Sequence, residues 1–261
     1  MRRCALVVAT SPITKPLREI GGFVAMSLDT MVALVRTPFA WREFIHQSWF
    51  TARVSLVPAV LLAVVFNAFV IFLLDVLIFE IGAADNSGTG AALAVVAQIG
   101  PAITVLVIGG AAATAMCADL GARTIREEID AMRVMGINPI QRLVVPRVAA
   151  LTVNSFLLSG LGTMVGLFSD YCFAVYISNV NPGAYAASLT LLIGLPDVII
   201  AVIKATMFGL AAGLIACYKG FTVGGGPQGV GNAVNETVVY TFMALYVINT
   251  LLSAVLAQVQ H

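Results

Sequence analysis

The sequence has little charge. Only 10% of its 261 residues are Asp, Glu, Lys or Arg, whereas 60% are hydrophobic. A soluble domain carries about 25% charged residues, because water must wet its surface. This chain has too few charges for such a surface, so lipid must face much of it. The composition therefore predicts an integral membrane protein.

Histidine is also scarce, and the cysteines are not paired. The two histidines, His46 and His261, lie far apart, which argues against a histidine-based metal site. The four cysteines form no C-x-x-C pair, and three of them fall within or beside apolar segments, where small buried side chains are expected. The net charge of +1 gives no overall field for nucleic acid. Metal and nucleic-acid partners are therefore not predicted.

Long apolar runs predict five membrane spans, each of which needs about 20 apolar residues. Four windows carry no charge and a fifth contains only Lys204: Val54–Leu74, Ala91–Ala118, Val148–Ser169, Val238–Val259 and Val198–Tyr218. The expected transmembrane helices cover about residues 52–80, 90–118, 146–177, 190–218 and 235–259. Small residues at helical spacing within them, such as Gly209 with Gly213, indicate close helix packing. The predicted fold class is an all-α integral membrane protein with five transmembrane helices.

The basic residues fall on alternate sides of these spans. Seven precede the first span, five lie between the second and third, and one follows the fourth: Arg2, Arg3, Lys15, Arg18, Arg36, Arg42 and Arg53; Arg123, Arg126, Arg133, Arg142 and Arg147; and Lys219. The other connections and the C-terminus carry none. Because Lys and Arg stay on the cytoplasmic side, the N-terminus is expected inside and the C-terminus outside a cytoplasmic (inner) membrane.

Residues 1–50 are expected to form a cytoplasmic leader and interfacial helices. The stretch 20–50 mixes apolar residues with charges, and aromatic residues such as Trp41 and Trp49 alternate with polar ones. This pattern is typical of an amphipathic helix lying in the membrane interface. An irregular linker is the alternative.

A short amphipathic helix is expected at about residues 122–136, between the second and third spans. One apolar stripe recurs at helical spacing: Ile125, Ile129 and Met132. Two i,i+4 ion pairs are expected on its other faces: Arg123 with Glu127, and Arg126 with Asp130. Gly136 is a helix stop, and Pro139 prevents continuation. Such a helix suits docking of another protein on the cytoplasmic side, although a solvated helical loop would give the same pattern.

At this segment the sequence resembles the MlaE/YrbE family of ABC transporter permeases. The resemblance rests on several motifs between Trp49 and the end of the chain: Glu127-Glu128-Ile129-Asp130-Ala131-Met132, Met135-Gly136, Pro139, Val145-Pro146-Arg147, Ile99-Gly100-Pro101, Asp119-Leu120-Gly121 and Ile203-Lys204. The regions around Lys219-Gly220 and residues 235–239 are most similar to the actinobacterial, mycobacterial branch, the YrbE permeases of Mce lipid importers, A-type.

The resemblance implies a domain at 51–261 that is a transport subunit, not an enzyme. It implies a cytoplasmic coupling helix that contacts the ATPase through seven residues: Glu127, Glu128, Asp130, Ala131, Met135, Gly136 and Pro139. The implied partners are a second YrbE-type permease, as a homodimer or heterodimer, two copies of a cytoplasmic Mkl/MceG-like ABC ATPase, and periplasmic MCE-domain proteins. The chain itself would hold no cofactor, since ATP and Mg would be bound by the ATPase.

The implied cargo is a hydrophobic lipid, moved in the import direction. Where the MlaE branch commonly has an Arg-Glu pair before its Gly-Pro element, this chain has Ala97-Gln98-Ile99. The loss of charge favours a fatty acid, mycolate-type lipid or sterol over a phospholipid head group. The candidates for the lipid pathway or gate are polar residues and a proline in or beside the spans: Asn67, Gln98, Pro101, Lys204 and Asp170.

Lys204 is the charge expected deepest in a span. It lies about 8 residues after Pro196 and thus about 12 Å into the helix. A charge there costs several kcal/mol unless it is paired or wetted, and Asp170 at the outer end of the third span could pair with it. A role in the lipid cavity or gate and a structural ion pair are equally compatible with the pattern.

No ATP-binding or catalytic pattern is evident. Residues 224–229 satisfy G-x-G-x-x-G, but a membrane helix precedes them and Pro227 interrupts them, so a flexible loop is expected. The chain has no G-x-x-x-x-G-K-[ST] motif. Two alternatives remain open, an intramembrane lipid-modifying enzyme and a membrane scaffold without transport activity.

Overall fold

A computed structural model of the chain describes residues 14–35, 39–80, 87–176, 180–189 and 194–259. Within these ranges all regular elements are helical. The α-helices are α1 (Thr14–Val35), α2 (Trp41–Glu80), α3 (Ser87–Ala94), α4 (Gly100–Val107), α5 (Ala113–Ile125), α6 (Glu128–Val134), α7 (Val145–Tyr176), α8 (Pro182–Ser188), α9 (Leu195–Phe221) and α10 (Pro227–Val259). Three short π-helical segments are η2 (Val95–Ile99), η3 (Ile108–Ala112) and η4 (Ile140–Val144).

Five helical stretches are long and apolar enough to cross a membrane, as predicted. They are Trp41–Val70, Val95–Ile125, Ile140–Tyr176, Asp197–Phe221 and Pro227–Val255. The second joins η2, α4, η3 and α5, and the third joins η4 and α7. The all-α class with five candidate spans is therefore confirmed.

Helix α2 runs through the predicted boundary between residues 50 and 51 without a break. The interfacial segment expected up to Phe50 is, from Trp41 onwards, the first part of the spanning helix. No Gly or Pro interrupts the chain between Trp41 and Arg53. Gln47 also donates to the Glu43 carboxylate one turn away, at 2.9 Å, which stabilises the polar start of the helix.

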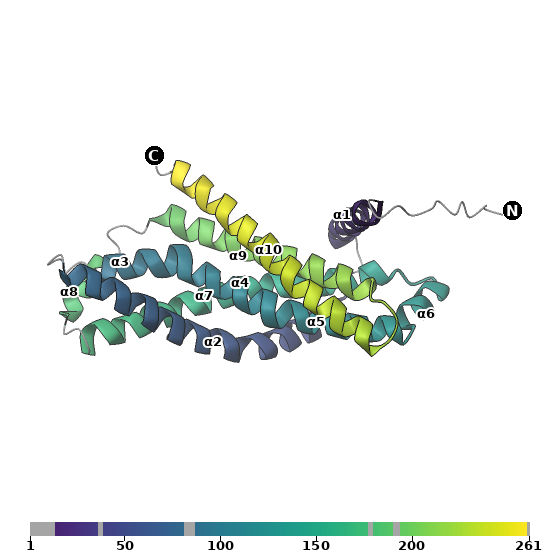
Figure 1. The fold of residues 1–261 in the computed structure, drawn as a ribbon, viewed down its shortest axis with the longest axis horizontal. Coiled ribbons are helices and arrows are strands. Elements are labelled where there is room, and N and C mark those ends of the chain that lie inside the picture. Colours follow the sequence, from purple (N-terminus) through teal and green to yellow (C-terminus); the bar gives the residue numbers. More distant parts are fainter. Residues whose placement is uncertain (1–13, 36–38, 81–86, 177–179, 190–193, 260–261) are drawn as a thin grey trace.

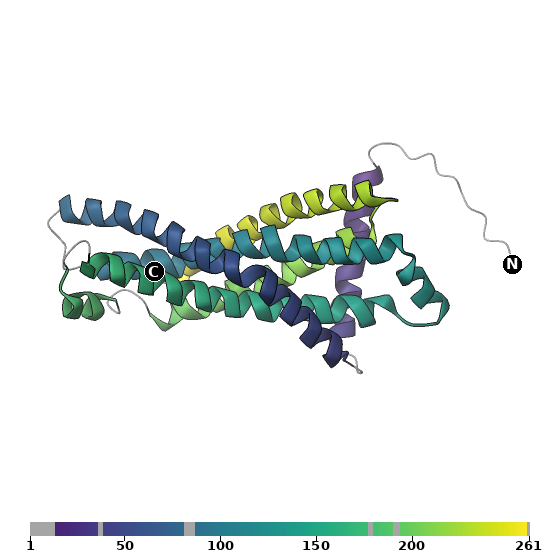
Figure 2. The same cartoon turned by 90° about the horizontal axis from the view of Figure 1, so that it is seen from below.

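Helix α1 lies crosswise on one end of the bundle (Figure 2). Its inner face packs Phe23, Met26 and Met31 against the core. Its outer face exposes an apolar stripe at i, i+4 spacing: Ile20, Val24, Leu28 and Val32. A helix that is apolar on both faces and perpendicular to the spans suits the surface layer of a membrane, with the bundle on one side and lipid on the other. Residues 1–13 of the expected leader lie outside the described ranges.

Glycines bring the central helices close together. A Cβ on Gly209 of α9 would lie 2.5 Å from the Cα of Thr152 in α7, and one on Gly220 would lie 2.7 Å from Cβ of Leu120 in α5. Such distances exclude any side chain without movement of the neighbouring backbone. The close packing expected from Gly209 and Gly213 is confirmed, since Gly213 faces Val148 of α7.

The two ends of the bundle differ (Figure 1). Helices α1 and α6 lie at one end, where α5 ends and α10 begins, and α8 lies at the other. The described part of the N-terminal region and the segment between the second and third spans thus share one end. The last turn of α10 points to the opposite end.

Candidate functional site

The segment between the second and third spans makes a sharp turn at Glu127. This residue has φ 59° and ψ 16°, a left-handed backbone conformation in which non-glycine residues are uncommon. It ends α5 and starts α6 as two separate helices. The single helix predicted over residues 122–136 is therefore divided, with α6 covering Glu128–Val134.

The break explains why both predicted i,i+4 ion pairs are wrong. Helical spacing is lost across Glu127, so the arginines find other carboxylates. Arg123 pairs with Asp119 at 3.3 Å and Arg126 with Glu128 at 2.9 Å. Arg133 of α6 pairs with Asp130 at 2.8 Å. The pairs of Arg126 and Arg133 are largely exposed and contribute at most about 1 kcal/mol each, whereas the Arg123–Asp119 pair is half-buried.

The end of α6 is fixed by a Schellman motif. The N–H of Ile137 donates to the Met132 carbonyl at 2.9 Å, and the N–H of Gly136 donates to the Arg133 carbonyl at 3.1 Å. Gly136 has φ 74°, which the motif requires and glycine adopts without steric cost. The predicted stop at Gly136 is therefore confirmed.

The chain then turns back into the membrane at Asn138 and Pro139. The Asn138 side chain accepts from the N–H of Ile140 at 3.0 Å, and its carbonyl accepts from Arg142 at 3.1 Å. Pro139 immediately precedes η4 and is buried. Local side-chain bonds of this kind favour a turn into a new helix.

Helix α6 has a buried side and an exposed side. Ile129 is buried and Met132 packs against the core, as expected from the predicted stripe, whereas Ile125 is exposed. Glu127, Asp130, Ala131, Val134 and Met135 are all exposed. Val134 is 89% exposed, an unusual position for a valine at the polar end of a bundle. The outer side of α6 thus combines acidic groups with uncovered apolar side chains, a composition suited to another protein.

A buried arginine lies beside this segment, at the ends of the spanning helices. Arg147, near the start of α7, is fully buried; its Nη2 lies 2.6 Å from Oδ2 of Asp119 in α5 and 3.7 Å from Oε1 of Glu43 in α2. Its Nη1 donates to the Leu143 carbonyl at 3.1 Å. One guanidinium therefore connects three spans beside the turn. A buried charge of this kind is stable only with its partners, because its desolvation costs several kcal/mol.

Asp119 and Arg147 belong to two separate motifs of the sequence, and neither motif predicts their contact. They are 28 positions apart, and Glu43 lies in a segment whose pattern predicts an interfacial helix. The sequence offers one weak indication of the contact: Asp119 directly follows the second apolar window, and the oppositely charged Arg147 directly precedes the third. Antiparallel spans place residues at their adjacent ends side by side, although α6 and η4 lie in the connection between α5 and α7.

The structure separates the two residues expected to form an ion pair within the membrane. Lys204 of α9 is buried, and its Nζ donates to the Ala97 carbonyl at 3.4 Å and to the Ser253 hydroxyl at 2.8 Å. Asp170 accepts a hydrogen bond from the Tyr185 hydroxyl of α8. The Lys204–Asp170 ion pair, which the sequence left as a possibility, is not formed between these two described residues.

The contacts of Lys204 depend on a local distortion of the second span. Ala97 lies in the π-helical segment η2, and π-helical turns frequently mark functional sites. Lys204 thereby links η2 to α10 through two neutral oxygens. This arrangement places an amine inside the bundle, and within the described residues it has no carboxylate as an ion-pair partner.

The other pathway candidates lie apart from one another. Asn67 is buried, donates to the Ala63 carbonyl at 2.6 Å and packs against Gly166 of α7. Gln98 is exposed, whereas Pro101 is buried at the start of α4. The structure therefore brings Lys204 close to the η2 segment but does not gather the five candidates into one cavity.

Among the described residues, no group of three or more His, Cys, Asp and Glu side chains could hold a metal ion.

The comparisons with known proteins give one family. The family model described as permease MlaE matches residues 44–255.

Individual relatives agree with that match. The chain is 29% identical to a probable ABC transporter permease protein of Rickettsia typhi over 243 residues, 93% of each chain. It is 30% identical over 177 residues to a probable ABC transporter permease protein of Synechocystis, covering 68% of this chain and 67% of the relative. It is also 30% identical to the chloroplastic protein trigalactosyldiacylglycerol 1 of Arabidopsis thaliana over 180 residues, 67% of this chain and 50% of the relative.

Proposed function

Because the chain belongs to the MlaE permease family of ABC transporters, we propose that it is the membrane subunit of a lipid transporter whose ATPase is a separate protein. The ATPase docks on the outer side of α6, and movement of this helix opens and collapses a lipid path between the spans. In this proposal the α1 and α6 end of the bundle is cytoplasmic, and the C-terminus lies on the other side of an inner membrane.

The observation that carries the proposal is the geometry of α6. This helix is short, stands between two spanning segments, begins at the left-handed turn of Glu127 and ends in the Schellman motif. An isolated helix of 7 residues would not be stable alone. Fixed in this way, it can transmit a push from a docked partner to α5 and η4.

The contacts of the buried arginine can transmit a displacement of α6 to the spanning helices. Arg147 connects α5, α7 and α2 directly behind α6, so displacement of α5 moves all three helices together. Asp119 pairs with both Arg147 and Arg123, which joins the buried contact to the exposed end of α5. Coupling of a separate ATPase to the helical bundle requires a rigid connection of this kind beside the docking helix.

The proposal also specifies a cargo and partners, which membership of the family does not define. The name of the Arabidopsis relative contains a glycerolipid, which supports a lipid as cargo. We propose an import complex of the Mce type, with a second YrbE-type permease of which this chain is the A-type partner, two Mkl/MceG-like ATPases, periplasmic MCE-domain proteins, and a fatty acid, mycolate-type lipid or sterol as cargo. The uncharged sequence around Gln98 supports the weakly charged cargo.

The test uses the complete complex in proteoliposomes, with ATP hydrolysis and lipid transfer measured in parallel. Glu128→Lys reverses a charge on α6, and Ala131→Pro removes the bond from the Ala131 N–H to the Glu127 carbonyl, which is 2.9 Å long. Both variants should insert normally and lose lipid transfer per ATP by about tenfold or more, because misdocking costs about 1.4 kcal/mol or more.

The matched control is Glu80→Lys, the same charge reversal at the exposed far end of α2. It should couple like the wild type. If both Glu128→Lys and Ala131→Pro transferred as much lipid per ATP as the wild type, α6 would not be the docking site of the ATPase, and the proposal would fail.

A further inference from the structure

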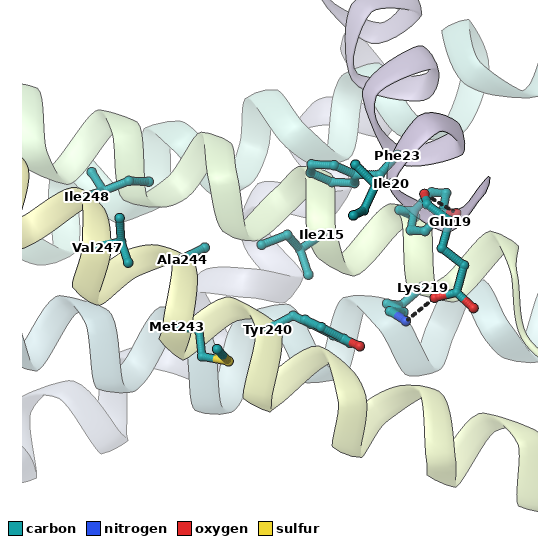
Figure 3. Close-up of a pocket in the computed structure, with 11 residues that line it drawn as sticks. Glu19, Ile20, Phe23, Ile215, Lys219, Tyr240, Met243, Ala244, Val247 and Ile248 are labelled. Carbon is teal, nitrogen blue, oxygen red and sulfur yellow. Dashed lines mark hydrogen bonds and ion pairs between the residues drawn. The ribbon is translucent and has the colours of Figure 1, made fainter. Parts of the chain in front are cut away.

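A groove runs between α1, α9 and α10 (Figure 3). It has a volume of about 640 Å³ and a mostly apolar lining, with Ile20, Phe23, Ile215, Met243, Val247 and Ile248 among its residues. The polar groups gather at one end, where Glu19 and Lys219 face each other, while Val247 and Ile248 lie at the other end. The groove is therefore amphiphilic along its length.

The polar end carries more acid than base. Lys219 Nζ lies 2.7 Å from Oε2 of Glu236 and 4.0 Å from Oε2 of Glu19, and it sits 4.5 Å from the centre of the Tyr240 ring. Glu19 lines the groove, whereas Glu236 lines the smaller cavity that adjoins it at Lys219, so these two carboxylates and one ammonium together carry a formal charge of −1. The Lys219 side chain is only 12% exposed, whereas those of Glu19 and Glu236 are 63% and 55% exposed. The excess negative charge thus faces outward, where a ligand can reach it.

The groove extends from the membrane surface into the hydrocarbon layer. Lys219 lies two residues before the end of α9 at Phe221, so the polar end is at the level where this span leaves the membrane. From there the apolar lining follows α10 from Tyr240 to Ile248, about 12 Å at 1.5 Å per residue. Polar groups at the surface and apolar walls below match a head group and an acyl chain.

We propose that this groove binds a phospholipid whose head group carries a cationic amine beside its phosphate. The amine lies between Glu19 and Glu236, and one acyl chain follows Met243 and Val247. An anionic head group without an amine would meet two carboxylates and one lysine already paired, so charge complementarity selects the zwitterion.

The bound lipid would fasten α1 to the bundle. Direct contacts between α1 and α9 are few and centre on Tyr218, whose hydroxyl donates to the Glu19 carbonyl at 2.8 Å and whose ring meets Phe23 edge-to-face at 5.6 Å. A lipid in the groove adds apolar contact along the same seam. The site involves neither α6 nor Lys204, so it does not depend on the proposed function.

The test measures binding of three lipids with identical acyl chains to the purified full-length chain by native mass spectrometry. The lipids are phosphatidylethanolamine, phosphatidylglycerol and diacylglycerol. Phosphatidylethanolamine should bind most tightly, by about tenfold over phosphatidylglycerol, since an amine–carboxylate contact replaces a repulsion. Equal binding of these two phospholipids would overturn the proposal.

Variants locate the site. Glu236→Gln should lower the preference for the amine about threefold, as expected for a partly exposed ion pair. Met243→Trp fills the apolar part and should abolish tight binding, whereas Met164→Trp, on the 76% exposed Met164 of α7, should not. Retained binding in Met243→Trp would place the lipid elsewhere. If Met243→Trp instead left lipid binding intact and broke an oligomer, a partner helix would occupy the groove and the proposal would be wrong.

Discussion

The second and fifth spans have nearly the same hydropathy but opposite surroundings. In the most apolar window of Val95–Ile125, 67% of residues are buried inside the molecule, compared with 11% in Pro227–Val255. Hydropathy measures only how readily a helix leaves water, and lipid is as apolar as a protein core. The difference teaches that composition identifies a span, whereas packing decides whether protein or lipid covers it.

Two features distinguish the central span. It carries glycines that meet neighbouring helices, such as Gly109, where a Cβ would lie 3.2 Å from Phe242. It also contains two π-helical segments, η2 and η3, which change the direction of its carbonyls. Helix α10 instead presents large apolar side chains outward, among them Met243, Val247 and Leu251. Substitutions in the two regions should therefore have unequal effects.

The largest effect is expected at the charged anchor of the central region. Arg147→Met should lower the free energy of unfolding by about 3 kcal/mol, because it leaves Asp119 and Glu43 without their buried cation. The measurement is unfolding by SDS in mixed micelles. The control is Arg142→Met, which alters an exposed arginine in η4 and should change little. Equal losses of unfolding free energy in the two variants would show that the ion pairs of Arg147 do not stabilise the fold.

A smaller effect is expected where α9 crosses α7. Gly209→Ala should cost about 1–3 kcal/mol of unfolding free energy, since its methyl group would overlap the backbone of Thr152. Gly160→Ala is the matched control within α7, because nothing lies within 4 Å of its Cβ position. Helix propensity should then make Gly160→Ala up to about 1 kcal/mol more stable. The same unfolding curves check both variants, and a stable Gly209→Ala would contradict the close crossing.

Within α10, two leucines should separate the inner from the outer face. Leu245 is buried and Leu251 is 62% exposed. Leu245→Ala should cost about 1–2 kcal/mol through lost packing, less than in a water-soluble core because the unfolded side chain remains in lipid. Leu251→Ala should change stability by less than about 0.5 kcal/mol in the isolated chain. A large loss at Leu251 would mean that α10 is covered by protein.

A small effect on stability is also expected where the two regions meet. Lys204→Met removes the bonds to Ala97 and Ser253, and it should shift the unfolding free energy by no more than about 1 kcal/mol, because an apolar group replaces a buried charge. Lipid transfer by the complete complex is measured on the same variant. Lost transfer with unchanged stability would assign Lys204 to the pathway, whereas unchanged transfer would leave it a packing role.

Much of the fold could be predicted because the information is local. Five apolar runs define the spans, and Gly136 with Pro139 marks the end of α6. The break at Glu127 could not be predicted, since glutamate favours helix and neither Gly nor Pro is adjacent. The helix start at Trp41 was missed because aromatic and charged residues suit the interface and a helix terminus equally well.

The candidate site was only partly predictable, because its key contacts are distant in sequence. Arg147 reaches Asp119 across 28 positions, and Lys204 reaches Ala97 across 107. A single sequence gives the charges but not their partners, so Asp170 was the plausible choice for Lys204 by charge alone. The structure instead satisfies Lys204 with two neutral oxygens and Asp170 with Tyr185.

The most direct measurement of the central idea is photo-crosslinking in membranes that contain the whole complex. A photoreactive amino acid replaces Val134 at the exposed end of α6 or, as the control, Ala187 in α8 at the opposite end of the bundle. We predict a crosslink from position 134 to a nucleotide-hydrolysing subunit and none from position 187. A crosslink to that subunit from position 187, with none from 134, would place the motor at the wrong end and contradict the account.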